Sequence, residues 1–526
     1  MKKLLAMALA AAMTISLAAC GAAAPAAAGG QAEPAPQETA AEEAAPAAEV
    51  KDGELYVDPD PANWPVVSME VNSFTDEQAN RDKVQDALNE YLVSINAGFK
   101  AELIPIAIGE RATRLPLMLT DQDNSLDLFT SRWYTTVSEL VRTGQCISLE
   151  KYKDIYPELW QMFPSAVYDT CKVNGELYSM PDANAFSNFE VYTIRKDVAE
   201  AAGYADRDGE LLTLDELQDL MAKAEEQHPE MAWIGDMLLK ALMGVDSLGD
   251  DNLIGVLMNR GLDETQIVNY YETDDFKDYC LMARDWEEKG YFWDDPVQVF
   301  PPSIDEGGRG AVAYEIASLV YAKSQMTNHT SIYDMCTFKL TEDLVGDNAC
   351  VVGGWQISTA CKNPDAAMKF IALAMTDEKV ANFLALGVEG DMYTVDENGC
   401  AWYAEGLDAS NCGWQMIAPW WFPNQCLTHP FQTTEAECYK DMEAHWTDPN
   451  VKYSNGMGFV FDSTGVFDQL AACRAVVQEY RGGLLYGQYA DVEGTIAKFN
   501  DELKAAGIDE VIAEMQTQFD AFLANK

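Results

Sequence analysis

The hydrophobic positions of this chain switch repeatedly between the spacing of strands and the spacing of helices. Residues 66–72, 99–108 and 126–130 are short apolar runs typical of strands. Between the first two, apolar residues recur every three or four positions. They predict a helix that begins at a capping box of Thr75 and Gln78 and ends at a glycine. Strands separated by helices predict an α/β fold.

The same helical spacing continues downstream. A second capping box, Thr213 with Glu216, predicts another helix start. Pro364 marks the beginning of a further helix, and Thr376 is expected to cap the helix that follows it. Near the C-terminus one apolar stripe predicts a last helix. Its residues are Val511, Ile512, Met515, Phe519, Phe522 and Leu523.

The N-terminus has the pattern of an export signal. Lys2 and Lys3 precede an uncharged segment, residues 4–19, which is too short to span a membrane comfortably. Small residues then lead directly to Cys20, as in bacterial lipoproteins. We therefore predict a signal peptide over residues 1–19 and a lipid on Cys20. The alternative is an ordinary signal peptide that is cut nearby.

The segment after Cys20 is dominated by alanine, proline and glutamate, and residues 22–49 contain no aromatic residue. Such a segment cannot bury enough apolar surface to offset the entropy lost on ordering. We predict that residues 20–53 are the lipidated cysteine and a disordered tether. No later apolar run is long enough to span a membrane, so the lipid is the only membrane anchor that we expect.

Charge restricts the partners of the folded part. The 526 residues include 86 Asp and Glu against 35 Lys and Arg, which gives a formal net charge of −51. A nucleic-acid partner is not expected, because phosphate binding requires a basic face. Anionic membrane surfaces are disfavoured for the same reason. At 48% apolar residues, the chain can nevertheless bury a large core.

Cysteine usage gives no sign of a disulfide framework. Twelve cysteines are present, and removing Cys20 from the count leaves eleven, an odd number, with no C-x-x-C pair. We predict that most of them are free thiols in the folded protein. This usage fits reducing surroundings, where cysteine serves as a small core residue.

Catalytic motifs are largely missing from the chain. It contains no P-loop, no G-x-G-x-x-G, no H-E-x-x-H and no G-x-S-x-G motif. Its four histidines show no metal-ligand spacing. We therefore expect no cofactor, no metal and no enzymatic activity. A carboxylate pair for glycoside hydrolysis stays possible, because 86 acidic residues always offer candidates.

Several motifs, taken in order, resemble the bacterial extracellular solute-binding proteins of ABC importers, family 1, the carbohydrate type. They lie at residues 126–130, 144–149, 174–181, 192–197 and 213–217. Residues 387–393 and 480–509 are similar to a lipoprotein subgroup that carries a C-terminal domain of unknown function. Residues 412–450 match no pattern.

This resemblance implies a two-lobed, periplasmic-binding-protein-like fold, in which hinge strands connect two α/β lobes that close on a sugar. The implied boundaries are residues 54–186 and 337–400 for lobe one, and residues 187–336 and 401–526, including a C-terminal helical region, for lobe two. Crossings between the lobes are expected near residues 183–190, 333–340 and 395–415.

A sugar ring has apolar faces and a hydroxyl rim, so flat aromatic and polar side chains bind it together. Trp133 directly follows the strand at residues 126–130, and Trp355 follows two glycines. Each tryptophan, taken alone, more often fills a core than lines a cleft. The candidate ligand-binding residues are Trp133, Arg132, Trp355, Trp421, Trp420, Trp233, Asn72, Phe74, Asn184 and Glu315.

The expected function is a monomeric, surface-anchored binding component that delivers an oligosaccharide to the membrane permease of an ABC importer. One alternative is a secreted glycan-cleaving enzyme, which needs a carboxylate pair in its cleft. A second is an importer subunit for peptides or amino acids, for which Arg132 could bind a carboxylate. A third is a structural adhesin, which would show no closure on a ligand.

Overall fold

The computed structural model describes most of the chain beyond its N-terminal segment. The described residues are 52–73, 78–120, 126–132, 134–182, 186–229, 231–234, 242–292, 334–347, 354–414, 423–433, 435–445 and 448–526, with the backbone alone at 312–316. The predicted signal peptide, Cys20 and most of the predicted tether lie outside these residues.

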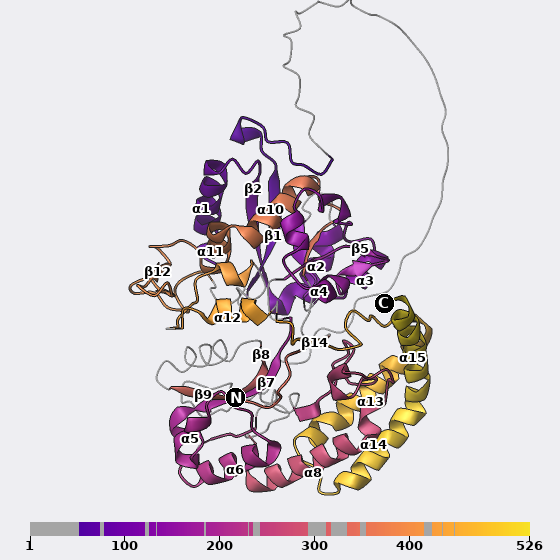
Figure 1. The fold of residues 1–526 in the computed structure, drawn as a ribbon. Helices are drawn as coiled ribbons and strands as arrows, with labels where there is room; N and C mark the ends of the chain where they lie inside the picture. The colour runs from indigo at the N-terminus through magenta and orange to yellow at the C-terminus, as the bar shows by residue number, and fades with distance from the viewer. Residues whose placement is uncertain are drawn as a thin grey trace, which may run out of the picture. The chain divides into compact units, whose positions relative to one another are not determined.

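A five-stranded sheet organises the first part of the fold (Figure 1). Its order is β2-β1-β3-β11-β6, in which β1 pairs in parallel with β2 and β3, and β11 pairs antiparallel with β3 and β6. The strands are β1 (Val66–Ser73), β2 (Lys100–Ala107), β3 (Leu128–Thr130), β6 (Met180–Pro181) and β11 (Gly354–Ile357).

Helices cover both faces of this sheet, which confirms the α/β prediction for this region. Apolar side chains of β1 and β2 pack with α1 (Arg81–Ser94), α10 (Pro364–Thr376) and α11 (Glu378–Leu386) in the first core. On the opposite face, Ile106 and Phe129 pack with α2 (Arg111–Thr120) and α3 (Val137–Arg142). Parallel strands that are covered on both faces are typical of α/β proteins.

A second core forms around an antiparallel sheet of order β8-β7-β9. Its strands are β7 (Phe189–Arg195), β8 (Val312–Ile316) and β9 (Met335–Lys339). Among the helices whose bounds the structure describes, six contribute to this core, and α8 packs with α13 and α14. They are α5 (Lys196–Ala202), α6 (Leu214–Glu225), α8 (Asp274–Lys289), α13 (Phe467–Leu485), α14 (Val492–Ala506) and α15 (Ile508–Asn525).

Short elements complete the described fold. They are α4 (Ser165–Asp169), β4 (Lys172–Val173), β5 (Glu176–Leu177), β10 (Val345–Gly346), β12 (Tyr393–Val395), β13 (Ala401–Tyr403), α12 (Cys438–His445) and β14 (Lys452–Tyr453), with several single 3₁₀ turns. β4 with β5, and β12 with β13, form antiparallel pairs.

Three chain segments pair where the chain passes from one core to the other. Phe186 belongs to the first core and Tyr192 to the second, and between them Asn188 exchanges backbone hydrogen bonds with Val345. β10, which contains Val345, pairs in parallel with β14. The second passage therefore follows β9, whose residues Cys336 and Phe338 still pack in the second core, rather than falling at 333–340.

The third passage also comes later than the expected 395–415. Trp414 packs in the first core and Phe431 packs against it, although residues 401–526 were assigned to lobe two. The reason is that β13 is held by the chain beyond it, since the Ala401 amide donates to the Pro430 carbonyl. Tyr453 and Met457 still pack in the first core, and the buried residues of the second core resume at Val466.

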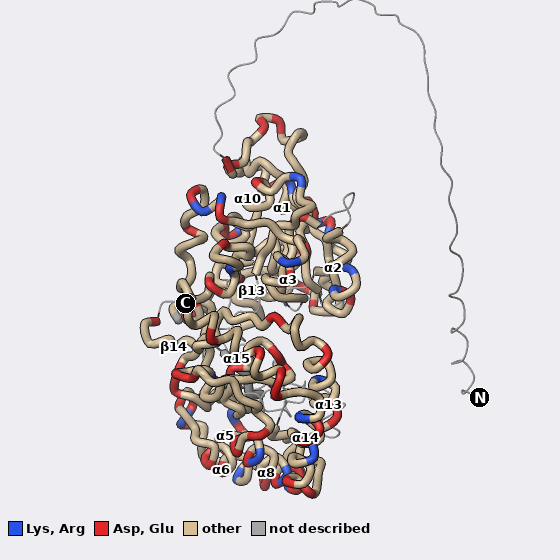
Figure 2. Tube along the Cα trace, turned by 90° about the vertical axis from the view of Figure 1, so that its right-hand side faces the viewer, with Lys and Arg blue, Asp and Glu red and all other residues tan. Residues whose placement is uncertain are grey.

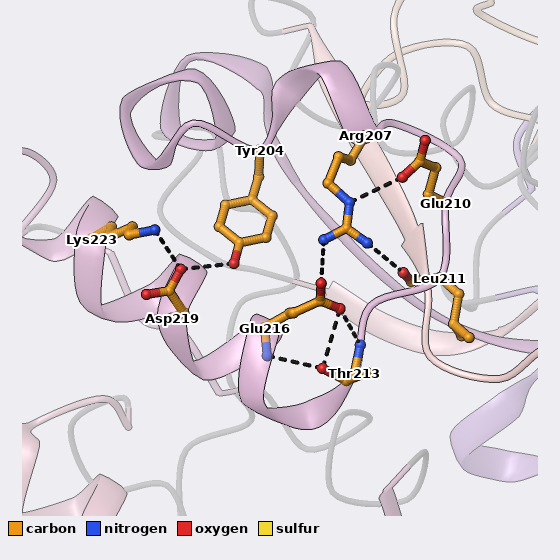
Figure 3. Close-up of polar contacts among 8 residues, drawn as sticks. All are labelled: Tyr204, Arg207, Glu210, Leu211, Thr213, Glu216, Asp219 and Lys223. Atoms are coloured by element: carbon orange, nitrogen blue, oxygen red, sulfur yellow. Dashed lines mark hydrogen bonds and ion pairs between the residues drawn. The ribbon is translucent and has the colours of Figure 1, made fainter.

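The capping box at the start of α6 confirms the sequence prediction (Figure 3). The Glu216 amide donates to Thr213 Oγ1 over 3.2 Å, and the Thr213 amide donates to Glu216 Oε2 over 2.9 Å. Arg207 reinforces the box, because its Nη1 donates to Glu216 Oε1 over 2.7 Å. The backbone amides of Thr213 and Glu216 are therefore both hydrogen-bonded, which fixes where the helix begins.

Two other predicted helix starts were wrong. The first helix begins at Arg81, several residues after Thr75, which itself lies outside the described residues. Thr376 is the last residue of α10, where its hydroxyl donates to the Ala372 carbonyl. Asp377 caps α11 instead, since its carboxylate accepts from the Val380 amide over 3.0 Å.

The described cysteines agree with the prediction of thiols outside disulfides. None of the ten cysteines among the described residues is part of a disulfide, and eight of them are buried. Burial raises the pKa of Cys146, Cys171 and Cys280 to about 12, so these thiols stay protonated near neutral pH. Cys20 and Cys350 lie outside the described residues.

Acidic residues are spread along the described chain rather than gathered in one segment (Figure 2). Many of the basic residues sit beside them in exposed pairs one helical turn apart, such as Arg284 with Glu288 and Lys289 with Asp285. Exposed pairs of this kind add little stability each. Within the described residues, no helix combines the length and apolar character that a membrane crossing requires.

Candidate functional site

A row of polar side chains runs along one face of β1. Val67, Met69 and Val71 face the first core, and the alternating residues Ser68, Glu70 and Asn72 lie on the opposite face. Of these, Glu70 is fully buried, and Asn72 is 4% exposed at the carboxyl end of the strand. Buried polar side chains in a strand need hydrogen-bond partners. The groups around Glu70 and Asn72 therefore show which polar atoms the fold uses and which it leaves for a ligand.

Glu70 forms a buried ion pair with Arg111 at the start of α2. Arg111 Nε lies 2.6 Å from Glu70 Oε1, and the side chains are 3% and 0% exposed. Glu70 Oε2 also accepts from the Thr130 amide over 3.1 Å. Arg111 in turn donates to the carbonyls of Thr130 and Arg132. This network ties β1 to the carboxyl end of β3 and fixes the backbone from which Arg132 projects.

Gln356 connects β11 to both neighbouring strand ends. Its Nε2 donates to Ser131 Oγ over 3.0 Å and to Ser179 Oγ over 2.7 Å. The strands pack tightly here, because a Cβ on Gly354 would lie 2.2 Å from the Met180 carbonyl oxygen. Glycine is therefore required at the start of β11 for it to pair with β6.

Asp182 immediately follows β6 at the same edge of the sheet. It is 4% exposed, and neither carboxylate oxygen accepts a hydrogen bond from the described residues. Arg132 Nη1 lies 3.8 Å from Asp182 Oδ2, beyond hydrogen-bonding distance. Burial raises the pKa of Asp182 to about 7, although Arg132 and Arg111 act in the opposite direction.

The edge thus gathers hydrogen-bond acceptors that the described residues leave unused. They are Asn72 Oδ1, Gln356 Oε1 and both oxygens of Asp182. They follow or sit beside the carboxyl ends of β1, β3 and β6, the edge at which open α/β sheets bind ligands. Acceptors of this kind suit a ligand that is rich in hydroxyl donors. Glu70, by contrast, accepts from Arg111 and the Thr130 amide, so it is not one of these unused acceptors.

The structure brings two of the predicted site residues, Asn72 and Arg132, to this edge. Two others have buried rings: Trp233 is 1% exposed in the second core and Trp355 is 2% exposed in the first. This is the core role that the sequence left open for every tryptophan. Glu315 lies on β8, where its backbone pairs with Glu190. Outside the described residues are Phe74, Trp133, Asn184, Trp420 and Trp421.

Sequence reasoning missed Asp182, Gln356 and the Glu70–Arg111 pair. Signals for two of them were present. Glu70 interrupts an apolar strand at the position where period-two alternation points away from the first core. Asp182 directly follows the proline that ends the motif at residues 174–181. For Gln356 there was no signal, because its role depends on two serines that are distant in sequence.

Two stretches of the chain match known protein families. Residues 82–381 match the model of the bacterial extracellular solute-binding protein family. Residues 455–524 match a domain of unknown function, DUF3502, in the region where a C-terminal domain was predicted. A carbohydrate ABC transporter substrate-binding protein of Streptococcus pneumoniae serotype 4 is 21% identical over 472 residues, which cover 89% of this chain and 93% of that protein.

Solved structures show the same fold at low sequence identity. The N-glycan transport solute-binding protein of Streptococcus pneumoniae has a TM-score of 0.74 and 20% identity, with 88% of this chain and 99% of that chain covered. The same protein in complex with Man5GlcNAc has a TM-score of 0.65 and 19% identity, with the same coverage. The two-lobed α/β fold is confirmed. The chain belongs to the bacterial extracellular solute-binding protein family.

Proposed function

We propose that this protein is the oligosaccharide-binding component of an ABC importer and that it does not itself transform its ligand. The observation that carries the proposal is the set of unused acceptors at the carboxyl edge of the first sheet: Asp182, Asn72 and Gln356. A hydroxyl-rich ligand supplies the donors that these groups lack. The name of the S. pneumoniae relative supports the carbohydrate class.

A thermal-shift screen of the purified full chain tests this function, because a ligand that binds the native state raises the melting temperature. Man5GlcNAc, Man1GlcNAc and kestose, which are ligands in solved complexes of similar structures, form the first panel. We expect a rise of a few degrees with at least one of them and none with amino acids or short peptides. A rise with peptides alone would identify a peptide importer subunit, and release of smaller sugars would identify an enzyme.

We further propose that a lipid on Cys20 holds the protein at the outer face of the cytoplasmic membrane, from which it delivers its ligand to the permease. The proposal rests on the sequence before Cys20. Cys20→Ser should shift the protein from the membrane fraction to the medium, or leave it unprocessed with its signal peptide attached. Membrane-bound Cys20→Ser protein that still incorporates labelled fatty acid would contradict the assignment.

A further inference from the structure

Asp182 differs from two other buried carboxylates of the described residues, Glu70 and Asp246. Buried Glu70 is held by Arg111 and by the Thr130 amide. Buried Asp246 accepts from the Leu248 amide over 2.9 Å and from Ser454 Oγ over 2.5 Å. These two carboxylates are hydrogen-bonded within the fold, as burial requires. Asp182 is also buried, at 4% exposure, yet both of its oxygens lack hydrogen bonds from the described residues.

The surroundings of Asp182 do not compensate its charge fully. The charged and titratable groups that face it are Arg132, which follows β3, Arg111 on α2 and Cys171, which follows α4. The two arginines lower its pKa, but burial outweighs them and sets it at about 7, against an ordinary value of 3.8. The Cys171 thiol stays protonated near neutral pH and brings no positive charge.

This environment makes the ionised form of Asp182 unfavourable for the unliganded fold. The folded state holds the proton more tightly than the unfolded state does. The resulting stabilisation is complete below about pH 4, and it is lost as the pH rises through about 7. Near neutral pH and above, the free protein therefore carries a destabilising carboxylate. A group of this kind, at the ligand-binding edge of an α/β sheet, indicates a role in function rather than in folding.

We propose that Asp182 accepts hydrogen bonds from hydroxyl groups of the bound oligosaccharide and selects neutral sugars over acidic ones, an inference that rests on the proposed function. Two neighbouring hydroxyls of one ring match the two oxygens of one carboxylate. An acidic sugar would place a second negative charge beside Asp182. Arg132 is the nearby cation that favours the ionised form of Asp182.

The test compares wild type with Asp182→Asn by isothermal titration calorimetry with Man5GlcNAc, Man1GlcNAc and kestose. At pH 8 we expect the variant to bind the responsive sugar 10- to 100-fold more weakly, in line with the loss of hydrogen bonds to a charged group, about 1.5–3 kcal/mol. Wild-type affinity should fall about 10-fold from pH 8 to pH 6, where Asp182 is largely protonated, and the variant should show no such fall.

Asp127→Asn is the matched control. Asp127 lies at the opposite end of β3, where its carboxylate accepts from the Ser68 amide over 2.9 Å. This variant should melt at a lower temperature than wild type and bind the sugar with unchanged affinity. Asp182→Asn should instead bind the sugar more weakly and be more stable than wild type. Its neutral amide should raise the melting temperature of the unliganded protein by a few degrees at pH 8.

The outcomes separate the two proposals. If wild type binds none of the three sugars, the proposed function fails and the role of Asp182 fails with it. If wild type binds and Asp182→Asn binds equally well with the same pH dependence, only the role of Asp182 is overturned. An Asp182→Asn protein that melts below wild type at pH 8 also overturns it, because Asp182 would then be a stabilising residue of the fold.

Discussion

Replacing Arg111 with methionine is expected to lower the free energy of unfolding by about 3–5 kcal/mol, because it leaves the Glu70 carboxylate buried without its cation. The pair is almost completely buried, at 3% and 0% exposure. The change also removes donors from the carbonyls of Thr130 and Arg132. Chemical denaturation followed by tryptophan fluorescence measures the loss.

Arg114→Met is the control for this prediction. Arg114 lies on the same helix, and its Nη1 is 3.0 Å from Glu110, but both side chains are more than 40% exposed. An exposed pair contributes about 0–1 kcal/mol, so this variant should unfold almost as wild type does. A double variant, Glu70→Leu with Arg111→Met, should recover part of the loss, because no charge then stays buried. Equal effects of Arg111→Met and Arg114→Met would contradict the assigned importance of the buried pair.

Trp133→Ala is expected to weaken oligosaccharide binding by about 30- to 1,000-fold, which corresponds to about 2–4 kcal/mol for an aromatic contact at a binding hot spot. The prediction comes from sequence position alone, since Trp133 lies outside the described residues. It directly follows Arg132, whose backbone Arg111 holds at the edge where the unused acceptors gather. Calorimetric titration with the responsive sugar gives the affinity, and the melting temperature of the free protein reports on folding.

Trp402→Ala provides the comparison, because Trp402 is 37% exposed and its Nε1 donates to Asp396 over 3.0 Å. Its loss should leave sugar affinity unchanged. Normal binding by Trp133→Ala would show that Trp133 is no stacking surface. A large fall in its melting temperature without ligand would instead assign Trp133 to the core.

Local signals predicted the strands β1, β2 and β3 and several helices, and a competing local signal explains the misplaced cap of α11. The predicted capping box at the start of α6 was correct because its two residues, Thr213 and Glu216, lie within one helical turn. The prediction that Thr376 caps α11 was wrong because Asp377, one residue later, is also a good capping residue. Its carboxylate accepts a hydrogen bond from the Val380 amide. The choice between adjacent caps depends on where the preceding helix ends, which hydrophobic spacing locates only to within a residue or two.

The candidate site was harder to predict than the fold because it depends on pairing between distant strands. Trp355 follows two glycines, a pattern that suggested close approach of the backbone to a ligand. Pairing of β11 with β3 and β6 instead turns its ring into the first core and turns Gln356 to the opposite face. A shift of one residue in that register would turn Gln356 into the first core and Trp355 to the opposite face. Nothing in the local sequence determines the register, so neither the burial of Trp355 nor the role of Gln356 could be derived from it.

The state of the thiols has a practical consequence for testing whether the protein closes on a ligand. The ten described cysteines are buried or half-buried, and burial also raises the pKa of Cys473, to about 11. Alkylating dyes react with thiolates, so these positions should label slowly in the native protein. Once Cys20 and Cys350 are replaced, a single cysteine introduced on an exposed helix position would carry nearly all of the fluorophore. The protein would then be a scaffold for a reagentless optical sensor of its own ligand.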